Sequence, residues 1–177
     1  IEAAVQLDCD HMVVSTGFAY LDVDAEDAFG WCAEAMGRIA RKAEQEGVTL
    51  AVEPFTKYTT HICNEASQLR RLLRTVNSPR LTGLADTDVI ATTAVDTFST
   101  FLDVIGPENL GRVHFVDGNP GGHLVPGDGV LDLDGALEKL KAIHYTGALG
   151  LEVLDRRYVF APEAAMKQAM DWYKERI

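Results

Sequence analysis

Hydrophobic and polar residues follow two different rhythms along the chain, and these predict strands and helices in turn. Short runs rich in Val, Leu and Ala that stop at polar or turn residues are typical of buried strands. They lie at 11–17, 48–53, 81–86, 111–117 and 147–154. Longer segments with apolar residues at i, i+3 and i+4 predict amphipathic helices. They lie at 25–46, from a cap at Asn64 to 76, around 94–105, after Asp132 and after Pro162, and residues 1–10 look like the tail of another helix.

Strand and helix thus alternate five times, which predicts right-handed βαβ units and a parallel sheet. An open doubly wound sheet and a (β/α)₈ TIM barrel both have this order. No GxGxxG motif follows the first strand, as a dinucleotide-binding doubly wound sheet would require. A barrel takes about 250 residues, and five strands alone would leave two unpaired edges. We therefore expect residues 1–177 to be one domain, the C-terminal five βα units of a TIM barrel, with more chain at the amino end.

Polar residues end four successive strands of this pattern. Glu53 closes the second strand before Pro54, and it falls on the same face as small residues two and four positions earlier. Glu152 has the same relation to the small residues before it, and Asp86 and His114 end the strands between. A carboxylate at the end of a buried strand is costly unless something positive meets it. All strand ends of a barrel face one mouth, so the four side chains predict a metal site.

The donor set also indicates a chemistry. Three carboxylates and one imidazole suit Mn²⁺, Co²⁺ or Mg²⁺ better than a thiolate-bound metal, with Zn²⁺ or Ni²⁺ as alternatives. Such an ion would polarise a carbonyl and a hydroxyl, acidify the adjacent C–H and stabilise the enediolate that forms. A carboxylate on each face could remove a proton from one side and return it on the other, which is epimerisation. Return to the neighbouring carbon would be aldose–ketose isomerisation, and the sequence leaves both open.

Composition narrows the class of partner. Hydrophobic residues make up 47% of the 177 residues, enough for one sizeable core. The net charge of −11 argues against nucleic acid, because phosphate binding depends on Lys and Arg. Three cysteines without close spacing favour a reducing, cytoplasmic compartment over a disulfide framework. No apolar run is long enough to span a membrane, so we expect a small-molecule enzyme, either a monomer or a homo-oligomer.

The motifs VEPFTKY, LAD, GRVHFVDGN, VPGDG and GLEVL resemble the sugar isomerase/epimerase family of xylose isomerase-like TIM barrels. They look most like its ketose 3-epimerases, including fructoselysine 3-epimerases. The resemblance covers nearly the whole chain as the later five-eighths of a barrel. It implies that Glu53, Asp86, His114 and Glu152 bind a divalent metal ion. It also implies that the two glutamates are the acid/base pair, on opposite faces of a sugar carbon.

The chain departs from this family at three positions near the mouth. Val89 stands where many members have a histidine, Pro120 where many have an arginine, and Thr59 where a glutamate is common. These departures concern the substrate rather than the metal site. They also suggest a second interpretation, in which the protein is a non-catalytic barrel that binds a sugar or a partner protein.

Four further residues are candidates for substrate contact. Fructoselysine-type members share the loop that carries His123, and Lys57, Asp117 and Asn119 lie near the mouth by position. A third interpretation, a relative of the apurinic endonucleases on the same fold, is disfavoured by the acidic charge. The chain also has too few histidines for a multi-zinc site.

Overall fold

The protein is described by a computed structural model that covers residues 1–18, 20 and 22–176. Its centre is a five-stranded sheet in the order β1-β2-β3-β4-β5, and every neighbouring pair is parallel. The strands are β1 (His11–Ser15), β2 (Thr49–Glu53), β3 (Leu81–Asp86), β4 (Leu110–His114) and β5 (Leu149–Gly150). Spatial order equals chain order, as in a TIM barrel. The five strands therefore form part of such a barrel, as the sequence predicts.

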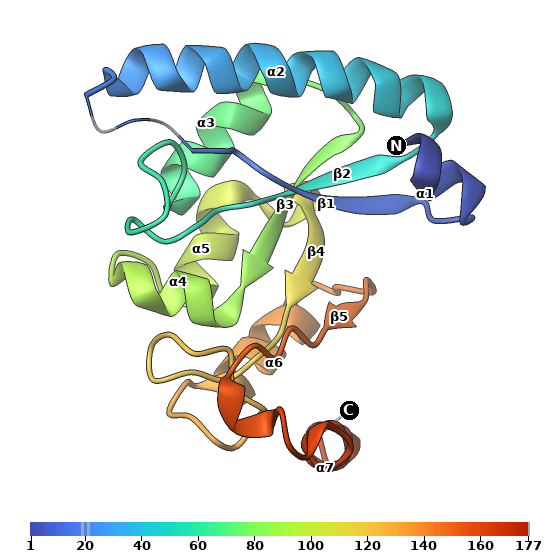
Figure 1. Cartoon of the computed structure of the whole chain (residues 1–177), viewed down its shortest axis with the longest axis vertical. Helices are drawn as coiled ribbons and strands as arrows, with labels where there is room; N and C mark the ends of the chain where they lie inside the picture. The colour runs from blue at the N-terminus through green and yellow to red at the C-terminus, as the bar shows by residue number, and fades with distance from the viewer. Residues whose placement is uncertain (19, 21, 177) are drawn as a thin grey trace.

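Helices join successive strands and form the outer layer. They are α1 (Glu2–Gln6), α2 (Ala25–Glu46), α3 (Ala66–Val76), α4 (Thr87–Thr93), α5 (Phe98–Ile105), α6 (Leu133–Ala142) and α7 (Pro162–Lys174), with 3₁₀ turns η1 (Pro107–Asn109) and η2 (Arg156–Tyr158). Helix α2 contacts α3, α3 contacts α5, and α5 contacts α6. Figure 1 shows α2 at one end of the molecule and α7 at the other. Among the described helices, none combines the length and apolar character needed to cross a membrane.

The hydrophobic core lies between this outer layer and the sheet. Leu50 and Val52 of β2 are buried in one cluster with Leu69 of α3 and Leu102 of α5. Each such side chain contributes about 1.5–3 kcal/mol of burial free energy. Because side chains alternate along a strand, Glu53 does not share the face of Leu50 and Val52. The core therefore fixes which side chains face the barrel interior.

The segment between β3 and β4 contains two α-helices where one was expected. Helix α4 begins directly after β3, because the side chain of Asp86 accepts hydrogen bonds from the backbone N–H groups of Asp88 and Val89 and caps it. Ala94, with a φ of 55°, ends α4. The prediction of a single helix around 94–105 was wrong in that it missed α4 and placed exposed Val95 on a buried face.

The residue that begins α3 also differs from the prediction. Glu65, not Asn64, is the N-cap, and the side-chain oxygen of Gln68 accepts from the backbone N–H of Asn64 at 2.7 Å. The Asn64 amide instead donates to the carbonyl oxygens of Phe55 and Thr60. Asn64 therefore closes the loop that follows β2.

The last strand is shorter than its apolar pattern predicts. Strand β5 contains only Leu149 and Gly150, so Glu152 lies beyond its end. Within the described chain, β5 pairs with β4 alone. A ladder with one partner ends where that partner ends, and β4 ends at His114, opposite Gly150.

Candidate metal centre

The four predicted ligands come together at the carboxyl ends of the strands. Glu53, Asp86 and His114 are the last residues of β2, β3 and β4, and Glu152 follows β5. The sheet register places Asp86 beside His114. One donor atom from each of the four residues lies within 4.8 Å of every other. Residues far apart in the sequence therefore form one cluster that could hold an ion.

The imidazole of His114 lies among the three carboxylates. Its Nδ1 is 3.0 Å from Glu53 Oε1, 3.1 Å from Glu152 Oε2 and 3.6 Å from Asp86 Oδ2. Glu53 and Asp86 are buried, whereas the side chain of Glu152 is 39% exposed. The cluster is thus closed on the side of β2 and β3 and open to solvent at Glu152.

Gly150 leaves space for the imidazole. It is the register partner of His114 on the neighbouring strand. A Cβ atom at position 150 would lie 3.1 Å from His114 Cδ2, closer than ordinary contact. The small residue therefore leaves room for the ring beside β5.

Asp86 shows how the cluster fits a cation. Its Oδ1 accepts two backbone hydrogen bonds at 2.8 Å each, from Asp88 and Val89. Its Oδ2 is buried and has no hydrogen-bond partner among the described atoms. An unpartnered buried carboxylate oxygen is costly, and an oxygen-rich donor set suits a hard divalent ion. The residues present therefore fit the metal that the sequence predicts.

The same geometry shifts the pKa values of the cluster. Burial alone would lower the pKa of His114, but the nearby carboxylates of Asp86, Glu53 and Glu152 favour the imidazolium and raise the pKa to about 10. Burial would raise the pKa of Asp86, but the imidazoles of His114 and His123 outweigh it and hold the pKa at about 2. Burial and the charge of Glu53 raise the pKa of Glu152.

Metal binding is therefore expected to release a proton and to strengthen as the pH rises. Without an ion, His114 stays protonated at neutral pH because its pKa is about 10. The ion must displace that proton from Nδ1, so the affinity should rise about tenfold per pH unit up to this pKa. Titration calorimetry with Mg²⁺ in buffers of different ionisation enthalpy measures the released proton. An affinity independent of pH between 6 and 9 would contradict the release of a proton from His114 on metal binding.

Of the four candidates for substrate contact, the structure brings His123 to the cluster. Its Nε2 lies 3.3 Å from Asp86 Oδ2 and 3.6 Å from Glu152 Oε2. Asp117 is buried and its carboxylate accepts three backbone N–H groups of its own loop, which gives it a structural role. Lys57 and Asn119 are exposed on loops that follow β2 and β4.

Sequence reasoning overlooked Asp88, which is fully buried in the first turn of α4. Its Oδ2 lies 3.0 Å from Nδ1 of His123. The signal in the sequence was a second aspartate two residues after a strand-end aspartate. The pattern of apolar and polar residues does not show that Asp88 is buried. The backbone N–H groups that its carboxylate accepts from, those of Gly121 and His123, lie in a loop more than thirty residues later.

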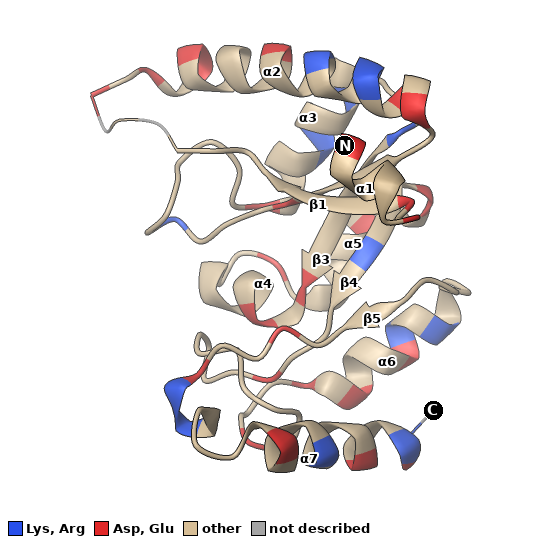
Figure 2. Ribbon diagram, turned by 45° about the vertical axis from the view of Figure 1, so that its right-hand side comes forward, with Lys and Arg blue, Asp and Glu red and all other residues tan. Residues whose placement is uncertain are grey.

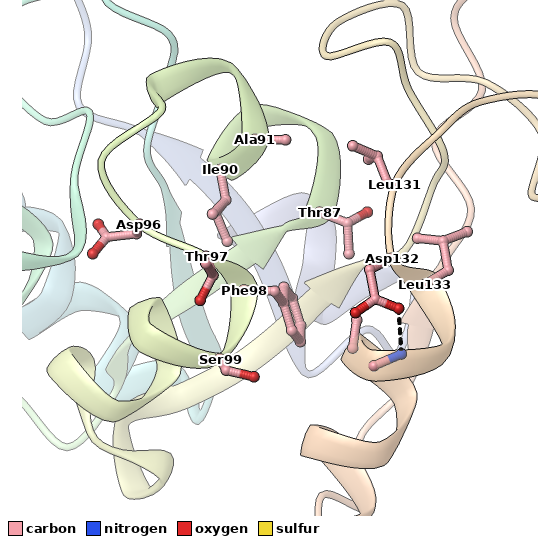
Figure 3. A pocket seen from close by; sticks show the side chains of 12 residues that line it. Thr87, Ile90, Ala91, Asp96, Thr97, Phe98, Ser99, Leu131, Asp132 and Leu133 are labelled. Atoms are coloured by element: carbon pink, nitrogen blue, oxygen red, sulfur yellow. Dashed lines mark hydrogen bonds between the residues drawn. The ribbon is translucent and has the colours of Figure 1, made fainter.

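A separate cavity lies beside α4. It has a volume of about 340 Å³, lies between the amino ends of α5 and α6, and is lined by residues such as Phe98, Leu131 and Leu133 (Figure 3). Asp132 in its wall is engaged, since it accepts from the backbone N–H of Gly135. None of the four cluster residues lines this cavity.

Figure 2 shows acidic segments at the strand ends, with Lys and Arg mainly on the outer helices and loops.

Comparison with known proteins identifies the family. A family model described as xylose isomerase-like TIM barrel matches residues 1–176. The chain belongs to this family. Fructoselysine 3-epimerase of Shigella flexneri is 26% identical over 176 residues, which are 98% of this chain and 63% of that protein. Ketose 3-epimerase of Arthrobacter globiformis is 30% identical over 118 residues, 67% of this chain and 39% of that protein.

Solved structures agree on the fold. The apo form of 3-keto-D-glucoside 4-epimerase from E. coli matches with a TM-score of 0.86 at 20% identity, over 98% of this chain and 67% of that one. D-psicose 3-epimerase in the presence of D-fructose matches with a TM-score of 0.77 at 23% identity, over 86% and 53%. The chain therefore spans about two thirds of the 3-keto-D-glucoside 4-epimerase structure. It includes the strand ends that carry Glu53, Asp86 and His114 and the segment that carries Glu152.

Proposed function

We propose that this protein is a divalent-metal-dependent sugar epimerase, and that it epimerises a ketose at C3. The observation that carries the proposal is the convergence of Glu53, Asp86, His114 and Glu152 on one point at the strand ends. Related proteins named fructoselysine 3-epimerase and ketose 3-epimerase support the choice of reaction. The buried Oδ2 of Asp86, which accepts no hydrogen bond from the described atoms, also favours a metal site.

The four residues would hold Mn²⁺, Co²⁺ or Mg²⁺. When bound, such an ion supplies the positive charge that acidifies a C–H next to a carbonyl and stabilises negative charge on the sugar oxygens. The buried side chains of Glu53 and Asp86 exclude water from one side of the cluster. The more exposed Glu152 leaves the other side open for the sugar to enter.

Glu53 and Glu152 would move the proton. They come from strands at different positions around the barrel, separated by β3 and β4. A base on one side of the carbon and an acid on the other invert its configuration. Burial and the negative charge of Glu53 raise the pKa of Glu152, which favours its protonated form more than in a free glutamate. The Oε1 atom of Glu53 is hydrogen-bonded to His114 Nδ1 at 3.0 Å, which fixes the position of this carboxylate.

His123 is the first choice for contact with the sugar. Its ring is adjacent to both Asp86 and Glu152, so a molecule placed at the cluster meets it. Lys57 and Asn119 lie on exposed loops and could contact a larger substituent of the sugar, such as an amine-linked group.

Two measurements on the purified protein test the proposal. The first is divalent ion content by mass spectrometry, where we expect stoichiometric ion that chelation removes. The second is incorporation of solvent deuterium into a panel of ketoses, where exchange at C3 should stop on chelation and return with Mn²⁺. A protein that binds no divalent ion and exchanges no ketose would be the non-catalytic barrel instead.

A further inference from the structure

Asp88 is a completely buried carboxylate that the proposed proton transfer does not use. Its Oδ1 accepts from the backbone N–H of Gly121 at 2.6 Å, and its Oδ2 accepts from the backbone N–H of His123 at 3.0 Å. The same Oδ2 lies 3.0 Å from Nδ1 of the His123 ring. A buried carboxylate is stable only where such donors surround it. Two of these donors hold a loop, and the third is a ring at the metal cluster.

The loop is built closely around this carboxylate. A Cβ atom on Gly118 would lie 1.8 Å from Asp88 Oδ1, so only glycine lets the loop pack there. His123 has a φ of 48°, in the left-handed region that a residue with a side chain seldom adopts. Such a conformation persists where neighbouring contacts determine it, and here the contacts are those of Asp88.

His123 connects Asp88 to the residues proposed to act on the sugar. Its Nε2 is turned to Asp86 Oδ2 at 3.3 Å and to Glu152 Oε2 at 3.6 Å. Its carbonyl oxygen accepts from the backbone N–H of Leu154 at 3.1 Å, two residues after Glu152. Asp88 therefore fixes a ring beside the cluster and, through the same residue, the backbone that follows Glu152.

We propose that Asp88 is a positioning residue. It holds the His123 imidazole in one orientation, with the proton on Nδ1 shared with the carboxylate and with Nε2 directed at the place where the sugar binds. A carboxylate on one ring nitrogen commonly sets the tautomer and orientation of a histidine at a metal site. The role of His123 toward the sugar rests on the proposed epimerase function, whereas the held ring does not.

The held ring is tested without any activity measurement. Nitrogen NMR of the imidazole in the metal-free and Mg²⁺-loaded protein should show a protonated, hydrogen-bonded Nδ1 at His123. This signal should shift in D88N, because the single amide oxygen cannot accept from both Gly121 and His123. An Nδ1 without a proton in the wild-type protein, or an unchanged signal in D88N, would overturn the proposal even if the protein is an active epimerase.

The consequence for the reaction is tested with a matched pair of variants. D88N should keep its divalent ion but lose about 10–100-fold in kcat/KM for the ketose that the wild type exchanges, the usual effect of removing an outer partner. The control is D128N, because Asp128 lies in the same loop and accepts from Tyr158 and Gln168 without touching His123. D128N should behave as wild type. Equal kcat/KM in D88N and D128N would contradict the proposal.

Variants of His123 decide the matter if D88N does not fold. In H123N the amide nitrogen replaces Nδ1, keeps the contact with Asp88 and tolerates the left-handed backbone, but Nε2 is gone. In H123Q the amide nitrogen replaces Nε2, and Asp88 loses its ring partner. We expect H123N to keep the melting temperature and lose turnover, and H123Q to lose both. Full turnover in either variant would refute the positioning role, while a wild type with no turnover would refute the epimerase and leave the NMR result standing.

Discussion

The D86N protein is expected to fold and to purify without a divalent ion. In the wild type, Asp86 Oδ1 accepts two backbone hydrogen bonds at the start of α4, while Oδ2 faces the cluster. An asparagine has one acceptor oxygen and one NH₂ group. The two N–H donors of α4 will take the oxygen, so the NH₂ group will occupy the position of Oδ2. A donor there repels a cation, and the helix cap is kept.

Metal content by mass spectrometry and the melting temperature of the metal-free protein measure these two effects separately. The control is D132N, because Asp132 caps α6 by accepting from Gly135 at 2.9 Å and takes no part in the cluster. The amide oxygen of the new side chain can still accept from Gly135, so D132N should keep both its melting temperature and its ion. If D86N retained wild-type metal content, Asp86 would not be a ligand.

The E152Q protein is expected to lose about 10²–10⁴-fold in the rate of deuterium exchange into the ketose, the usual contribution of general acid–base catalysis. A glutamine keeps the size of Glu152 and one oxygen that can face the ion, but it cannot carry the proton. The ion should therefore bind more weakly yet still load at millimolar Mn²⁺. The loss should persist at saturating metal, because it comes from the missing carboxylate.

Exchange rates at several Mn²⁺ concentrations separate the two effects. The matched control is E138Q on α6, where Glu138 is exposed, pairs with Lys141 and is not one of the four cluster residues. E138Q should exchange at the wild-type rate. Wild-type exchange in E152Q would show that Glu152 takes no part in the proton transfer. Glu53 would then be the one remaining candidate base.

The sequence predicted the parts of the fold that depend on side-chain rhythm. Helix α2 begins and ends at the expected residues, Ala25 and Glu46, because a cap at Asp24, an apolar stripe and Gly47 all agree. The meeting of Glu53, Asp86, His114 and Glu152 was also predictable, because all four follow strands whose carboxyl ends face a common barrel mouth.

The predictions that failed concern features that are determined by residues distant in the sequence. Helix α4 was missed because it is a short segment, TDVIATT, whose start is set by the side chain of Asp86 rather than by a polar linker. The role of Asp88 could not be read because it requires the conformation of the glycine-rich loop around Gly121. The extent of β5 depends on where its single neighbour ends. Local pattern carries none of this information.

The close approach of Gly150 to the imidazole of His114 offers a way to alter the ion preference of the proposed metal site while leaving its four residues unchanged. A methyl group at position 150 would press on Cδ2 and tilt the ring slightly. Mg²⁺ demands a near-ideal octahedron, whereas larger or softer ions accept a distorted one. Replacing Gly150 by alanine is therefore expected to lower the affinity for Mg²⁺ more than the affinity for Mn²⁺.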